Sequence, residues 1–266
     1  MLIDFHTHAF PDKLAERAIS SLSETGGISP YSNGKISDLV EIMDEEAVDI
    51  SVVLNIATKP SQETNVNNFA ITLLENSRII PFGSVYPGSE TSLSEIERLH
   101  KAGVKGIKFH PEYQWFDVMD KKVFPAYEKC GELGMIVTFH AGGDVGFKAP
   151  FHSDPERLNK LCDMFPKTTF VFAHMGGYDM WDKGADTYKY HDNMYLDTSI
   201  INTVSIICND SAKRIIDNVG IDHVLFGSDM PWARPSHSKA KLETLGLSEE
   251  DLQKIYSDNA KKLLNI

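Results

Sequence analysis

Short apolar runs rich in β-branched residues alternate along the chain with longer segments in which apolar residues recur every three or four positions. The clearest short run, DISVVLNI at residues 49–56, has the continuous pattern typical of a strand buried on both faces of a parallel sheet. We predict eight strands in all, over residues 1–8, 49–56, 79–85, 104–110, 135–140, 169–174, 194–199 and 223–229.

The longer segments have the 3.6-residue spacing of amphipathic helices. We predict helices over residues 11–23, 36–47, 61–76, 89–102, 121–133, 154–165, 179–188, 203–219 and 248–266. Asp154 followed by Pro155 indicates one helix start, because proline is favoured at the first helical position. Residues 25–34, rich in Gly, Ser, Pro and Asn, predict a long loop after the first strand that is able to cover a site.

The alternation of strands and helices indicates an α/β fold with a parallel sheet. Eight such units within about 250 residues fit a closed (β/α)8 TIM barrel. No linker or low-complexity stretch interrupts the pattern, so we expect one domain over residues 1–266. An open doubly wound sheet is the alternative fold, but no G-x-G-x-x-G follows a strand, which excludes its usual dinucleotide motif.

Charge and composition narrow the range of partners. The formal net charge of −12 disfavours nucleic acid and anionic membranes, and it means that an anionic substrate needs a local cationic pocket. No apolar run approaches the roughly 20 residues of a membrane helix, and the first residues show no secretory signal pattern. Three cysteines without a CxxC motif favour a reduced, cytoplasmic setting.

Five predicted strands end in side chains that titrate or bind metals. In a TIM barrel the carboxyl ends of the strands surround the active site, so these side chains are expected to meet. They are His6 and His8, Lys108 and His110, His140, His174, and Asp229. Several histidines with one carboxylate suit a divalent ion, with zinc favoured and manganese, iron or cobalt also compatible.

The motifs around these residues resemble the amidohydrolase superfamily. They are His6-Thr7-His8, the single His140, Ala-His174-Met-Gly-Gly, and Gly-Ser-Asp229-Met-Pro-Trp. The sequence is most similar to the amidohydrolase-related (type 2) branch, which contains metal-dependent hydrolases and nonoxidative decarboxylases. The resemblance covers the whole chain, as far as the ending Asn259-Ala-x-x-Leu263-Leu264.

This resemblance implies a role for each residue of the predicted site. It implies that His6, His8 and His140 bind the metal ion. Asp229 is expected to bind or closely approach the ion and to handle the proton of its water. His174 is expected beside the ion, as an acid/base or as a hydrogen-bond donor to the substrate.

Three functions remain open on the sequence alone. Metal activation of water, with a carboxylate to exchange the proton, predicts a hydrolase for an amide, ester or lactone of a small organic molecule. The alternative is nonoxidative decarboxylation of a small aromatic or unsaturated acid. A metal-bound barrel that only binds a ligand is the third, although an aspartate beside an open metal position has little structural use.

Substrate contacts are expected from pocket and loop residues, namely Lys108, His110, Trp115, Trp232 and Arg234. Lys108 lies where two-metal members of the superfamily carry a carboxylated lysine that bridges the ions. Since the type 2 branch generally has one metal, we expect one ion and an unmodified Lys108. The alternative is a second ion held by His140 and His174. We also consider a homodimer as the assembly.

Overall fold

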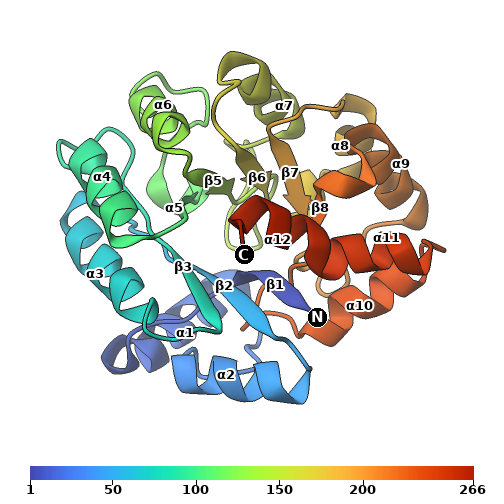
Figure 1. The fold of residues 1–266 in the computed structure, drawn as a ribbon, viewed down its shortest axis with the longest axis horizontal. Helices are drawn as coiled ribbons and strands as arrows, with labels where there is room; N and C mark the ends of the chain where they lie inside the picture. The colour runs from blue at the N-terminus through green and yellow to red at the C-terminus, as the bar shows by residue number, and fades with distance from the viewer.

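The computed structural model describes residues 1–266 and contains eight short parallel strands surrounded by helices (Figure 1). The strands are β1 (Ile3–Thr7), β2 (Ile50–Leu54), β3 (Ile79–Phe82), β4 (Gly106–Phe109), β5 (Ile136–Phe139), β6 (Phe170–Phe172), β7 (Met194–Asp197) and β8 (Val224–Leu225). Each of the eight predicted strands is therefore present, mostly with shorter bounds because the predicted ranges included the residues that follow the strand.

The strands close into a barrel. Hydrogen bonding runs in the order β1-β2-β3 and β4-β5-β6-β7-β8, with every pair parallel. Single pairings of Gly83 with Ile107 and of Thr7 with Met230 join the two runs. Phe5 also donates from its backbone N–H to the carbonyl oxygen of Phe226 at 2.8 Å. The predicted TIM barrel is confirmed, and the open sheet is excluded.

Helices form a ring outside the strands, as Figure 1 shows. They are α1 (Asp12–Gly26), α2 (Ile36–Glu45), α3 (Glu63–Leu73), α4 (Ser92–Ala102), α5 (Pro111–Gln114), α6 (Phe124–Leu133), α7 (Pro155–Met164), α8 (Trp181–Thr187), α9 (Asn209–Val219), α10 (Pro235–Glu243), α11 (Glu249–Gln253) and α12 (Asn259–Leu264). None of these helices combines the length and the apolarity needed to cross a bilayer.

The later part of the chain departs most from the predicted elements. The helix expected from residue 203 begins only at Asn209, where Cys208 Sγ accepts a hydrogen bond from the backbone of Ser211. Helices α5 and α10 lie in stretches predicted as loops, and each has a proline in its first turn. The single helix expected at the carboxyl end is divided by a π-helical turn at Lys254–Asp258.

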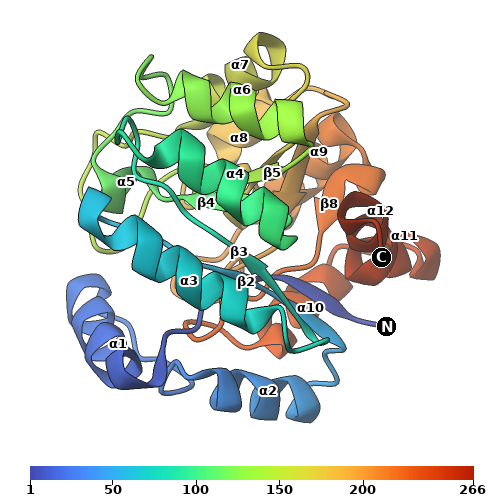
Figure 2. The same ribbon diagram turned by 60° about the vertical axis from the view of Figure 1, so that its left-hand side comes forward.

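The inside of the barrel is filled by its own apolar cluster. The cluster combines inward side chains of the strands, such as Ile3, Phe5 and Phe82, with Ala260 and Leu264 of α12. Helix α12 lies across the centre of the ring in Figure 1 and beside the start of β1 in Figure 2. It therefore closes the amino-terminal end of the barrel, and the opposite end is left for a site.

A bulge in β1 aims the histidine pair into the barrel. The register pairs Asp4 with Ser51 and Thr7 with Val53, so β1 has one residue more than β2 in this interval. An extra residue reverses the alternation of side chains along a strand. Phe5 can thus fill the barrel interior while His6 and His8, at even positions, also face inward and line the cavity above it.

Candidate active site

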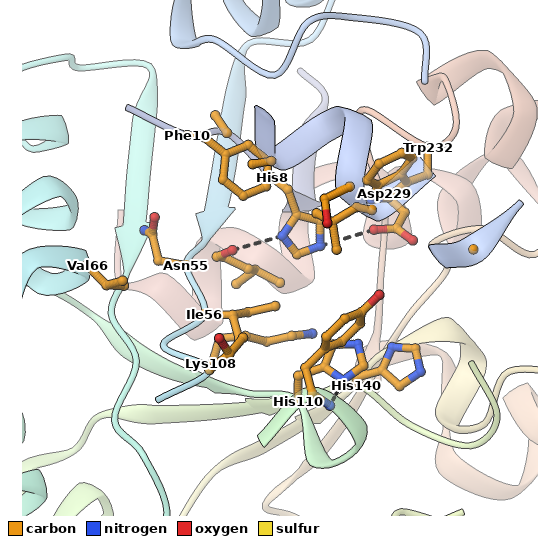
Figure 3. A pocket seen from close by; sticks show the side chains of 18 of the residues that line it. His8, Phe10, Asn55, Ile56, Val66, Lys108, His110, His140, Asp229 and Trp232 are labelled. Atoms are coloured by element: carbon orange, nitrogen blue, oxygen red, sulfur yellow. Dashed lines mark hydrogen bonds and ion pairs between the residues drawn. The ribbon is translucent and has the colours of Figure 1, made fainter. Parts of the chain in front are cut away.

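A cavity of about 610 Å³ opens at the carboxyl ends of the strands. Figure 3 shows side chains from opposite sides of the barrel pointing into it. The predicted site residues that line this cavity are His6, His8, Lys108, His110, His140, His174, Asp229 and Trp232. These predicted residues therefore meet in one cavity, although their arrangement within it differs from the expected one.

Three of these residues form one compact group, which we call the His6–His8–Asp229 group. The Nε2 atoms of His6 and His8 are 3.2 Å apart. Asp229 Oδ1 lies 3.4 Å from the first and 3.2 Å from the second. Donor atoms around a tetrahedral zinc ion are about 3.4 Å from one another, given bond lengths of about 2.1 Å. The spacing fits a shared metal ion.

Hydrogen-bond partners fix the protons of both histidines on the side away from this group. Nδ1 of His6 donates to Asp197 Oδ2 at 2.8 Å, and Nδ1 of His8 donates to the carbonyl oxygen of Leu54 at 2.9 Å. In its neutral form, each imidazole then presents an Nε2 lone pair to the other and to a carboxylate. Such a group favours a cation between its members, and this pattern of outer hydrogen bonds is typical of metal-binding histidines.

His140 and His174 form a second electron-rich contact, which we call the facing pair. His140 Nε2 donates to the carbonyl oxygen of Gly143 at 2.7 Å. The Ser199 hydroxyl donates to Asp197, so it accepts from His174 Nδ1 at 2.7 Å. The remaining lone pairs, on His140 Nδ1 and His174 Nε2, face each other at 3.0 Å. This contact also requires a cation, either a proton or a metal ion.

The expected ligand set of His6, His8, His140 and Asp229 is therefore divided between two positions. His140 does not belong to the group formed by the other three, and its free nitrogen faces His174 instead. Burial lowers the pKa of His140 to about 3, and it lowers the pKa of His174 well below the usual range. Both imidazoles are thus held neutral near pH 7, which leaves their lone pairs available.

His110 supports His140 from the side. Their rings stack with centroids 4.1 Å apart and planes 13° apart. His110 Nε2 lies 3.3 Å from Asp144 Oδ2, and the backbone of Tyr113 reaches His110 Nδ1 at 3.5 Å. Because both ring nitrogens have partners, this cluster needs no ion. Its geometry fixes the plane of the His140 ring.

Lys108 lies at the centre of the site without a partner. Its side chain is fully buried, and no group accepts a hydrogen bond from Nζ. Burial lowers the pKa of Lys108 to about 8, although the negative charges of Asp197 and Asp229 act in the opposite direction. A substantial neutral fraction of this amine therefore exists near physiological pH, unlike an ordinary lysine.

The backbone is strained where it presents the site. Asp229 has a φ of +75° and His174 a φ of +59°, both in the left-handed region that side chains with a Cβ avoid. Such strain is found most often at functional sites. Burial opposes ionisation of Asp229, but His6, His8 and Lys108 outweigh it and hold the pKa of Asp229 below its usual value.

Two residues expected to contact a substrate do not line the cavity. Trp115 is 70% exposed, and its ring packs against Phe147. The guanidinium group of Arg234 lies 2.6 Å from Glu46 and 2.6 Å from Glu45, and it ties α10 to α2. The expected placement of both residues is corrected, because sequence position after a strand does not determine the direction of a loop side chain.

Two carboxylates of the site were not found by sequence reasoning. Asp197 ends β7, so the same rule that identified the other strand ends would have identified it. Asp144 follows His140 by four residues in a glycine-rich loop, and only the folded structure shows that it returns to His110. The residues of α1 that line the cavity were also missed, since residues 25–34 alone were expected to cover it.

Comparison of the chain with known proteins identifies its family. The family model described as amidohydrolase matches residues 3–266. The chain belongs to the amidohydrolase family. This finding confirms the resemblance seen in the sequence, and it makes the chain a member of an enzyme family whose barrels share this fold.

Individual relatives of this family member differ in activity. A dihydroorotase of Helicobacter pylori strain HPAG1 is 25% identical over 179 residues, a match that spans 62% of this chain and half the length of that protein. A TIM-barrel protein from Bordetella bronchiseptica has a TM-score of 0.76 at 18% identity, over 99% of this chain and 98% of that one. A dihydroxybenzoic acid decarboxylase from Polaromonas sp. JS666, solved with bound manganese, has a TM-score of 0.71 at 17% identity, over 99% and 96%.

Proposed function

We propose that this amidohydrolase hydrolyses an amide, ester or lactone of a small organic molecule with a bound divalent metal ion. The observation that carries the proposal is the His6–His8–Asp229 group, whose donor atoms converge on the wall of a large cavity. A divalent ion held there would polarise a carbonyl group and make a water molecule more acidic. Zinc is the favoured ion, and manganese, iron and cobalt suit the same donors.

Asp229 is the proton acceptor in this proposal. Its Oδ1 atom faces the two imidazoles, and no protein group donates a hydrogen bond to Oδ2. The ionised carboxylate can therefore take the proton of the attacking water through Oδ2. It then returns that proton to the leaving nitrogen or oxygen atom, as a general base that becomes a general acid.

The facing pair supports a second ion, in place of the single ion expected from the sequence. His140 Nδ1 and His174 Nε2 would bind it, and Lys108 stands beside both groups. The neutral Lys108 amine can add to dissolved CO₂, so that a C–N bond forms and the nitrogen loses its proton to water. The resulting carbamate would replace an unpartnered buried amine by an anion between two cations.

Decarboxylation is the second candidate. The decarboxylase from Polaromonas holds manganese in the same fold, and its structure aligns with nearly all of this chain. The cavity residues would serve that reaction differently, because a proton must reach the carbon atom that loses CO₂. His174 is the donor in this case, since the Asp197–Ser199 pair holds the opposite side of its ring.

The reaction products distinguish hydrolysis from decarboxylation. Protein purified from zinc-supplemented medium is incubated with cyclic amides, lactones, acyl amino acids and hydroxybenzoates, and the products are followed by proton NMR. We expect a new acid with a matching amine or alcohol and no CO₂. Release of CO₂ would establish the lyase instead, and binding without turnover would leave only a binding protein.

Metal content tests the site itself. We expect His6→Ala to remove most bound metal, whereas His100→Ala, on the exposed face of α4, should keep it. Elemental analysis should find two ions per chain after preparation with bicarbonate, and Lys108→Ala should retain fewer. One ion per chain beside an unmodified Lys108 would contradict the two-ion proposal and restore His174 as an acid/base.

A further inference from the structure

The cavity extends well beyond the groups that would hold the ion, and apolar side chains of α1 and α3 line its outer half. We propose that this outer half is a subsite for the hydrocarbon tail of a substrate whose polar reacting group lies at the ion site. The substrate class is thus an extended amphipathic carbonyl compound, such as an acyl or alkyl derivative. This inference rests on the proposed hydrolase and adds the form of its substrate.

Helix α1 supplies one wall of the subsite. Leu14, Ala18 and Leu22 are spaced by four residues, so they share one face of the helix, and all three line the cavity. The face that packs on the rest of the protein is a different one, formed by Ala15 and Ile19. Leu14 is 54% exposed, so much of its side chain is open to water at the cavity.

Helix α3 supplies the opposite wall. Val66 and Phe69 project from α3 into the same cavity, and Phe10 and Ile28 close it from the two ends of α1. Figure 3 shows Val66 and Phe10 on the side of the cavity away from His110 and His140. Apolar surface left open to water is unfavourable, and covering it by a ligand gains about 25 cal/mol per Å².

Two of the polar side chains in this region pair with each other. Gln62 Oε1 accepts hydrogen bonds from both the backbone and the hydroxyl group of Thr58, at 2.9 Å each. Arg17, Ser21 and Asn65 also line the cavity and are exposed, so a ligand would meet them beside the apolar side chains. The hydrocarbon tail of a substrate would pack on the apolar side chains.

Helix α1 is held in place as a wall. A Cβ atom added at Gly26 would lie 3.0 Å from the Cγ2 atom of Val145 in the loop after β5, so that side chain packs closely on the end of the helix. Ile19 packs closely against Gly34, because a Cβ atom added at Gly34 would lie 2.6 Å from the Cγ1 atom of Ile19. The helix is thus anchored at its end and along its inner face, and the slot between α1 and α3 is a built feature.

A chain-length series tests the subsite without turnover. Acetate, butyrate, hexanoate and octanoate are titrated calorimetrically into zinc-loaded protein, with the weak members measured in competition with octanoate. Each added methylene should tighten binding about threefold to fourfold, which is the effect of burying one such group. Leu14→Asp and Val66→Asp should each weaken octanoate binding at least about tenfold and leave acetate binding unchanged.

The controls separate this inference from the reaction. Leu93→Asp places the same charge at an exposed leucine of α4 outside the cavity and should preserve the series. Equal affinity for all four acids would overturn the subsite, even if the protein proves to be a hydrolase. A gradient that survives both cavity variants would also overturn it. A gradient lost in those variants supports the subsite even if no hydrolysis is found.

Discussion

At the residue scale, the carboxylate of Asp197 contacts both the His6–His8–Asp229 group and the facing pair. Asp197 is fully buried, and its Oδ2 atom accepts from His6 while its Oδ1 atom accepts from the Ser199 hydroxyl group and from the backbone of His174. The same side chain therefore orients a residue of the His6–His8–Asp229 group and a residue of the facing pair. Loss of its charge should affect both positions together.

We expect Asp197→Asn to weaken metal binding about 10- to 100-fold, the usual effect of losing such an orienting partner. An amide in this position can present its NH₂ group to His6 Nδ1 and so favour the wrong tautomer. Competition with a chelator measures the change in affinity. Asp192→Asn, in the exposed loop before β7, serves as the control. Unchanged affinity in Asp197→Asn would show that the hydrogen bond has no orienting role.

Most residues of this candidate site were predicted because each follows a buried strand. A residue that follows a strand of a parallel barrel lies at the carboxyl end of the barrel, where all the strands end. The sequence did not reveal how the nitrogens pair. His140 was expected with His6 and His8, yet the choice between ring nitrogens depends on partners such as Gly143, which tertiary structure alone brings near. Arg234 was misplaced for the same reason, since its partners belong to α2.

At the scale of the elements, α12 closes one end of the barrel with apolar side chains. Leu264 is 1% exposed and belongs to the apolar cluster inside the barrel, although it lies only two residues from the end of the sequence. The periodic apolar pattern at residues 248–266 predicted a helix there. It could not predict the π-helical turn, because the break depends on packing against the barrel and not on local preference.

We expect Leu264→Ala to lower the free energy of unfolding by about 2–5 kcal/mol, because it leaves a void inside the barrel. Leu74→Ala removes the same atoms at an exposed position after α3 and should cost less than about 1 kcal/mol. Urea unfolding of both variants gives the comparison. Equal losses would mean that α12 contributes no more than a surface segment.

For the whole molecule, buried histidines couple folding to pH. In the metal-free protein, burial lowers the pKa values of His6, His140 and His174, and that of His140 falls from 6.5 to about 3. The unfolded chain therefore binds more protons than the folded chain below about pH 6.5. Stability must then fall as pH decreases through this window. The pKa of His110 is also lowered by burial, and Asp4, with its pKa raised by burial to about 7, is one group that acts in the opposite direction.

We expect the free energy of unfolding of chelator-treated protein to decrease between pH 7 and pH 5. Each histidine that stays neutral in the folded state contributes up to about 1.4 kcal/mol per pH unit. Urea titrations at several pH values measure the slope, and His140→Gln should make it shallower. A stability that is constant over this range would show that the histidines are protonated equally in both states.

The contact between the end of β1 and the turn after β8 also limits when the site can form during synthesis of the chain. His8 and Asp229 meet at 3.2 Å, yet they are far apart along the chain, so His8 is made long before Asp229. At roughly 5–20 residues per second, translation separates them by about 10 to 45 seconds. Throughout that interval the histidine pair lacks Asp229, and the barrel has no closing strand. The nascent chain is thus unable to complete the His6–His8–Asp229 group, and capture of an ion by all three residues must follow the emergence of β8 from the ribosome.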